Sequence, residues 1–195
     1  MIVNPNKKIK RNPGLGFTLV ETLVAVSILT ISILGTFTAV QKGLATSYFA
    51  KDQVTAFFLI QEAIEQIRNT RDTNGLQSID SKSTGGSGVH WLKGIAELPG
   101  DPCSLGKVCR VDPYTGSLPT YCGLEGTDCP VIRQDPATGL FGYNAGWNAT
   151  RFTRNISIVP VAGNLDEVVI EVTVKWVSGS FSKTITVEQS LFNNH

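Results

Sequence analysis

The sequence predicts an α+β fold in which a long N-terminal helix packs on a C-terminal antiparallel β-sheet. The run Phe17–Val40 is apolar, contains no proline and has Glu21 as its only charged residue. Residues 41–68 continue without proline and place apolar side chains at three- and four-residue spacing, the pattern of an amphipathic helix. Residues 150–191 instead alternate apolar and polar side chains, which predicts strands with one buried face.

The composition narrows the class of function. The chain has 195 residues, with 17 Lys and Arg against 16 Asp and Glu, and 42% of its residues are apolar. The near-neutral charge excludes a polybasic nucleic-acid binder, and the apolar share with only 17% charged residues excludes a disordered chain. No basic stripe interleaved with aromatic residues predicts direct contact with nucleic acid.

The apolar run is long enough to cross a bilayer. As a helix, residues 17–40 would extend about 36 Å, against roughly 30 Å of membrane hydrocarbon. The cations that precede the run are Lys7, Lys8, Lys10 and Arg11. By the positive-inside rule these cations place the N-terminus in the cytoplasm, and everything C-terminal to the run then faces outward.

Three interpretations of this N-terminus compete. The first is a secretory signal with a cleavage site at Gly43-Leu44-Ala45, which the length of the run and the charge of Glu21 oppose. The second is a plain signal anchor, which gives no reason for Glu21. The third rests on the hexapeptide Gly16-Phe17-Thr18-Leu19-Val20-Glu21 after a basic leader. This pattern resembles the prepilin-peptidase site of type IV pilins and type II secretion pseudopilins.

The resemblance implies a processing event and an assembly role. The leader, residues 1–16, would be removed by cleavage of the Gly16–Phe17 bond, and the new amine of Phe17 would be methylated. Glu21 would matter for assembly into a filament. The residues themselves allow a second role for Glu21, because Thr18-x-x-Glu21 also matches a helix capping box. A lone carboxylate in a membrane costs roughly 2.5–3.5 kcal/mol, and the Phe17 amine of a neighbouring subunit could offset that cost.

The family implies a structural subunit rather than an enzyme. Residues 58–65 and the Val174-Lys175-Trp176 strand are most similar to V-type minor pilins and I-type minor pseudopilins. The implied partners are other pilin subunits through the N-terminal helix, the prepilin peptidase and methyltransferase, and an inner-membrane assembly platform. The precursor would lie in the cytoplasmic membrane, with the leader inside and the head outside, and the assembled subunit in an extracellular or periplasmic filament.

Two functional alternatives stay open. The filament could be a pilus, a secretion pseudopilus or a competence pseudopilus. The chain could also be a membrane-anchored exported binding protein or adhesin that does not polymerise. An enzyme is not expected, because His90 and His195 lie in no nucleophile or metal motif, and the sequence predicts no cofactor and no metal.

The long helix is expected to span residues 17–70, with 17–40 in the membrane or filament core. Asn74-Gly75 is the expected stop signal, and the glycine-rich stretch 76–88 is expected to be a mobile loop. The head would comprise residues 71–195. The apolar side chains predicted to pack the outer half of the helix on the sheet are Val54, Phe57, Phe58, Ile64 and Ile67.

The head is expected to have two parts. Residues 99–146 hold most of the prolines and all four cysteines, so they form a loop-rich insertion with little regular structure. The sequence Asp-Pro-x-Thr-Gly occurs within it at 112–116 and 135–139, which favours two β-hairpin turns over calcium ligation. Residues 150–191 are expected to form three strands, with Ser178-Gly179 joining the last two as an antiparallel pair.

The cysteines are expected to form disulfides rather than a zinc site, because they contain no C-x-x-C pair and lie in an exported, oxidising domain. The first choice of pairing is Cys103 with Cys109 and Cys122 with Cys129. The turn at 112–116 could instead bring Cys109 against Cys122 and leave Cys103 to pair with Cys129.

Overall fold

The computed structural model describes residues 16–179 and 181–193. The contacts between its residues divide the chain into two compact units, residues 1–48 and 49–195. Helix α1, Leu19–Ser83, has residues in both units. The cations of the leader lie outside the described residues.

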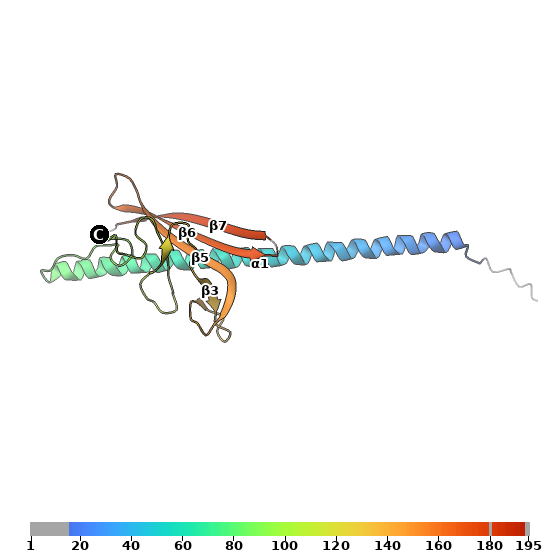
Figure 1. Cartoon of the computed structure of the whole chain (residues 1–195), viewed down its shortest axis with the longest axis horizontal. Coiled ribbons are helices and arrows are strands. Elements are labelled where there is room, and N and C mark those ends of the chain that lie inside the picture. The colour runs from blue at the N-terminus through green and yellow to red at the C-terminus, as the bar shows by residue number, and fades with distance from the viewer. Residues whose placement is uncertain (1–15, 180, 194–195) are drawn as a thin grey trace, which may run out of the picture. The chain divides into compact units, whose positions relative to one another are not determined.

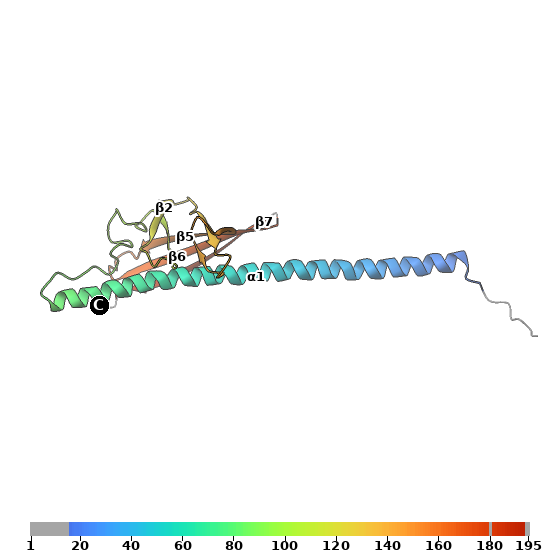
Figure 2. The same cartoon turned by 90° about the horizontal axis from the view of Figure 1, so that it is seen from below.

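The second unit contains a seven-stranded antiparallel sheet that lies beside the later part of α1 (Figures 1 and 2). Its strands are β1 (Lys107–Arg110), β2 (Thr120–Leu124), β3 (Val131–Gln134), β4 (Phe141–Gly142), β5 (Asn148–Pro160), β6 (Glu167–Ser178) and β7 (Phe181–Phe192). Strand β5 pairs with β6, β1 and β3, while β7 pairs with β6, β2 with β1, and β4 with β3. The α+β fold predicted from the sequence is therefore confirmed.

Helix α1 packs on the sheet through one narrow stripe. Its buried residues recur every three or four positions: Asp52, Ala56, Leu59, Ile60, Ala63, Ile64, Ile67, Arg71, Asn74, Gly75 and Ser78. The apolar members share one core with side chains of β5 and β6, including Ile156, Ile170 and Val172, each fully buried. Because side chains at this spacing lie on one face of a helix, the stripe is continuous along the second unit.

The prediction of which helical side chains pack on the sheet is only partly right. Ile64 and Ile67 are buried as expected, but Val54, Phe57 and Phe58 keep 53%, 43% and 65% of their surface exposed. These three residues lie between the positions of the buried stripe. Large apolar side chains on this helix therefore face away from its own sheet.

The predicted end of the helix is wrong. Asn74 and Gly75 are buried inside α1, where the Asn74 side-chain amide donates to the carbonyl oxygens of Trp91 and Lys93 at 3.1 and 2.9 Å. The helix ends after Ser83 with Gly85 at a φ of 83° and a hydrogen bond from the Gly86 N–H to the Ser81 carbonyl at 2.9 Å. This is a Schellman cap, and the expected loop at 76–88 is helical as far as Ser83.

The three predicted strands of residues 150–191 are confirmed as β5, β6 and β7. Core-facing and outward-facing residues alternate along β5 and β6, with Phe152 opposite Trp176 and Pro160 opposite Val168. Strand β7 pairs with β6 over its full length without a register shift, and Ser178 lies opposite Phe181 at the hairpin.

The insertion at 99–146 is more ordered than expected, because it contains strands β1 to β4. The prediction that both Asp-Pro-x-Thr-Gly sequences form hairpins is confirmed. The first lies between the paired strands β1 and β2, and the second between β3 and β4. Gly116 and Gly139 close these turns at φ values of 60° and 76°, a region that glycine enters without strain.

Candidate functional site

The junction between Gly16 and Phe17 is open to solvent and precedes the first helical residue. A Cβ built on Gly16 would meet no atom within 4 Å, and the Phe17 side chain is 79% exposed. Residues 16–18 are not helical, so the backbone at this bond is free of helical hydrogen bonds. A peptidase needs such an accessible, extended backbone.

Helix α1 begins with half of the expected capping box. The Glu21 N–H donates to Thr18 Oγ1 at 3.2 Å, so Thr18 is the N-cap residue. Within the described residues, the Thr18 N–H donates no hydrogen bond to the Glu21 carboxylate. The carboxylate favours the positive end of the helix dipole but is otherwise available to a group from outside.

The first unit presents an exposed apolar helix. Every side chain from Leu19 to Val40 is exposed, and within the described residues α1 is the one helix long and apolar enough to cross a membrane. The hydroxyl groups of this segment donate to carbonyl oxygens three or four residues earlier: Thr22, Ser27, Thr30, Ser32, Thr36 and Thr38. Polar groups satisfied within the helix can be transferred to hydrocarbon at low cost.

Glu21 is the exception in this segment, because its charge has no partner on the helix. The next charged residue along the chain is Lys42. Since a helix rises about 1.5 Å per residue, this cation lies roughly 30 Å from Glu21 along the axis, which is too far for an ion pair. Within residues 16–179 and 181–193, the site at the start of α1 is therefore one carboxylate without a cationic partner, at the edge of a large apolar surface.

The four cysteines form the two disulfides that were the first choice from the sequence. Cys103 pairs with Cys109 and Cys122 pairs with Cys129, each with 5.1 Å between the Cα atoms. The first disulfide is fully buried and fastens the segment before β1 to that strand. The second joins β2 to the segment before β3. The insertion is thus crosslinked twice within a region that has few core residues.

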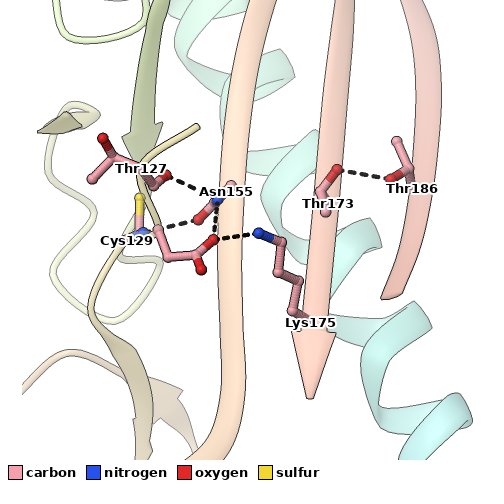
Figure 3. Close-up of polar contacts among 7 residues, drawn as sticks. Thr127, Cys129, Asn155, Thr173, Lys175 and Thr186 are labelled. Carbon is pink, nitrogen blue, oxygen red and sulfur yellow. Dashed lines mark hydrogen bonds and ion pairs between the residues drawn. The ribbon is translucent and has the colours of Figure 1, made fainter. Parts of the chain in front are cut away.

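A polar cluster that sequence reasoning missed fastens the second disulfide to the sheet (Figure 3). Asn155 donates to Asp128 Oδ1 at 2.9 Å and to the Thr127 carbonyl at 3.2 Å, and accepts from the Cys129 N–H at 2.9 Å. Lys175 Nζ donates to the same Asp128 oxygen at 2.6 Å. This hydrogen bond lowers the pKa of Asp128, and Asn155 adds to the effect against the opposing effect of partial burial. The feature of the sequence that could have revealed this cluster is the outward-facing position of Asn155 and Lys175 on their strands.

Arg154 is a second residue that sequence reasoning missed. It lies on the core face of β5 and is 1% exposed. Its Nη1 donates to the Leu59 carbonyl and to Glu62 Oε2, both at 2.7 Å. Its Nη2 donates to the Val111 carbonyl at 2.8 Å. One guanidinium therefore links α1, β5 and the segment after β1.

His90 takes no part in any of these clusters. His90 is exposed, and its Nδ1 accepts a hydrogen bond from the Leu92 N–H at 3.2 Å. His195 lies outside the described residues.

Comparison of the chain with protein-family models, with curated proteins and with solved structures finds no match.

Proposed function

We propose that this chain is a minor structural subunit of a type IV pilus or related pseudopilus, processed after Gly16 and assembled through its N-terminal helix. The observation that carries the proposal is the position of Glu21. It is a carboxylate with no partner among the described residues, in the first turn of an exposed apolar helix and beside an accessible Gly16–Phe17 bond.

Cleavage of this bond would supply the missing charge. Hydrolysis leaves a carboxylate on Gly16, which departs with the leader, and an amine on Phe17, which stays cationic when it is methylated. Within one chain the amine lies beside the helix N-terminus, where the dipole disfavours positive charge. An amine that pairs with the Glu21 of a neighbouring subunit escapes this penalty and also neutralises the carboxylate. Charge pairing between subunits thus explains both residues together.

The surface of the second unit also suits an assembled subunit. Val54, Phe57 and Phe58 expose apolar surface on the side of α1 that its own sheet leaves uncovered. Contiguous exposed apolar side chains mark protein contacts. The two disulfides suit an exported head, because oxidising compartments preserve such bonds. In this proposal the leader faces the cytoplasm and the head faces outward.

The bond at which the chain is cleaved distinguishes the proposal from its alternatives. We expect Gly16→Phe to remain an uncut precursor in cells that have the prepilin peptidase, because a bulky side chain obstructs the cleft that glycine fits. The matched change Ala45→Phe should leave processing intact, and the mature wild-type chain should begin at Phe17. N-terminal mass spectrometry reads both results.

The alternatives predict different N-termini. A secretory signal would place the mature start at Thr46, and Ala45→Phe rather than Gly16→Phe would then block cleavage. A plain anchor or non-polymerising adhesin would retain its leader even in the presence of the peptidase. Either result would contradict the pilin proposal.

A further inference from the structure

The loop-rich side of the second unit contains a cavity of about 330 Å³ between the first Asp-Pro-x-Thr-Gly hairpin and the segment after β4. The lining residues that matter are Arg110, Asp112, Tyr114, Thr120, Tyr143 and Asn144. They come from β1, from the loop that follows it, from the start of β2 and from the segment after β4. The volume lies within the range of small-molecule sites, about 300–1,000 Å³.

A glycine lets an aromatic ring and a carboxylate approach each other beside this cavity. A Cβ on Gly142 would lie 2.8 Å from Trp147 Cζ3 and 3.1 Å from Asp112 Oδ1, so both groups lie against the bare backbone. The Tyr114 ring meets the Trp147 ring edge to face, with 4.9 Å between the centroids. Tyr114 is 58% exposed, so this contact holds an accessible ring next to the carboxylate.

The polar groups of the cavity have unused hydrogen-bonding capacity. The Arg110 guanidinium lies 4.5 Å from the centroid of the Tyr143 ring, and no carboxylate pairs with it in the part of the chain that the structure describes. Asp112 Oδ1 accepts from the Tyr114 N–H at 3.2 Å, which leaves Oδ2 open. The Asn144 oxygen accepts from the Gly146 N–H at 3.0 Å, which leaves its amide N–H groups open.

The tyrosine below Arg110 adds no charge to the cavity. Burial raises the pKa of Tyr143, against the opposing effects of the Arg154 and Arg110 charges. The ring therefore stays neutral, and Arg110 and Asp112 supply one positive and one negative group. A site with both charges and the open groups of Asp112 and Asn144 suits a neutral ligand that has many donors and acceptors.

A larger cavity of about 700 Å³ between α1 and β5 lacks these features. Its Asp52 carboxylate is already paired with Arg151 at 3.1 Å. Its rings, Phe141 and Phe152, are half-buried and buried. The smaller cavity is therefore the stronger candidate for a ligand site.

We propose that the cavity lined by Arg110, Asp112 and Tyr114 binds a neutral pyranose unit of a glycan. The Asp112 carboxylate accepts hydrogen bonds from neighbouring sugar hydroxyls, and Arg110 and Asn144 donate to sugar oxygens. The apolar face of the sugar ring packs on the exposed Tyr114 ring. The Asp112 charge disfavours an anionic ligand. This binding does not depend on the filament role.

The test uses the full chain in lauryldimethylamine oxide micelles, because this detergent has no sugar headgroup to compete. The probes are the methyl α-glycosides of glucose, mannose, galactose and N-acetylglucosamine, followed by saturation-transfer NMR and tryptophan fluorescence. We expect at least one probe to bind saturably with a Kd of about 1 mM. Tyr114→Ala and Asp112→Asn should each weaken this binding about tenfold.

The matched control is Tyr121→Ala, which removes another exposed tyrosine that lies outside the cavity. It should leave binding unchanged, and the circular dichroism of all variants should match that of the wild type. Absence of saturable binding by every probe up to about 50 mM would overturn the proposal. Binding that survives both cavity variants at wild-type strength would overturn it equally, because the sugar would then occupy another surface.

Discussion

Arg154→Ala is expected to lower the free energy of unfolding of the second unit by about 3–5 kcal/mol, because it removes a buried guanidinium from its hydrogen-bond partners and empties its space in the core. Glu62 would lose its cation and the Val111 carbonyl its donor, and the lost side chain would leave a cavity in the core. Urea unfolding of the detergent-solubilised chain, followed by tryptophan fluorescence, measures the effect.

Two further variants show how the effect of Arg154→Ala should be interpreted. Arg68→Ala removes a half-buried arginine that pairs with the exposed Glu65 on α1, and it should cost less than about 1 kcal/mol. Arg154→Met retains most of the side-chain volume, so it should recover part of the loss caused by Arg154→Ala. If Arg154→Ala proved no more destabilising than Arg68→Ala, the guanidinium would not be the structural link between α1, β5 and the segment after β1.

Glu21→Gln is expected to reduce incorporation into filaments by tenfold or more while membrane insertion and cleavage continue. The change keeps the shape of the side chain and the Thr18 N-cap but removes the charge that would pair with a neighbouring amine. An unpaired charge in the membrane costs roughly 2.5–3.5 kcal/mol, so its removal should not impair insertion. The measurement is the ratio of subunit in sheared filaments to subunit in membranes.

The matched control for this prediction is Glu65→Gln on the same helix, an exposed acid whose partner is Arg68. It should assemble at the wild-type ratio. If Glu21→Gln also assembled at the wild-type ratio, the helix dipole would account for the acid and the proposed contact between subunits would be wrong.

The sheet could be predicted closely because a strand has a period of two. Once Ile156 and Ile158 are assigned to the core, the alternation along β5 assigns each second residue before them to the core as well. Arg154, between Phe152 and Ile156, is one of these residues. The same alternation that predicted the strand could have identified Arg154 as a buried arginine. Which partners it meets could not be predicted, because Leu59 and Val111 lie far from it in the sequence.

The helix was predicted less well, since several of its features depend on tertiary contacts. Gly75 and Gly85 both follow a polar residue, but α1 continues through Gly75, where Asn74 contacts the segment at 91–93. Hydrophobicity alone favoured Phe57 and Phe58 for the core. The buried stripe instead passes through Ala56 and Ala63, whose small side chains allow the helix and sheet to pack closely.

Some features of the candidate site could also be predicted from the sequence, and others depend on tertiary contacts. Local patterns predicted both disulfides and the Thr18 N-cap, because each depends on neighbours within a few positions. The cavity beside Tyr114 could not be predicted, since Trp147 and Asp112 meet only after β4 folds against the loop that follows β1.

The most direct test of the filament proposal is mass spectrometry of the wild-type chain in filaments sheared from intact cells. The proposal predicts that the filaments contain this chain and that its N-terminal peptide begins with N-methylated Phe17. A chain that is absent from filaments and found only in membranes, with its leader attached or with Thr46 as its first residue, would contradict the proposal.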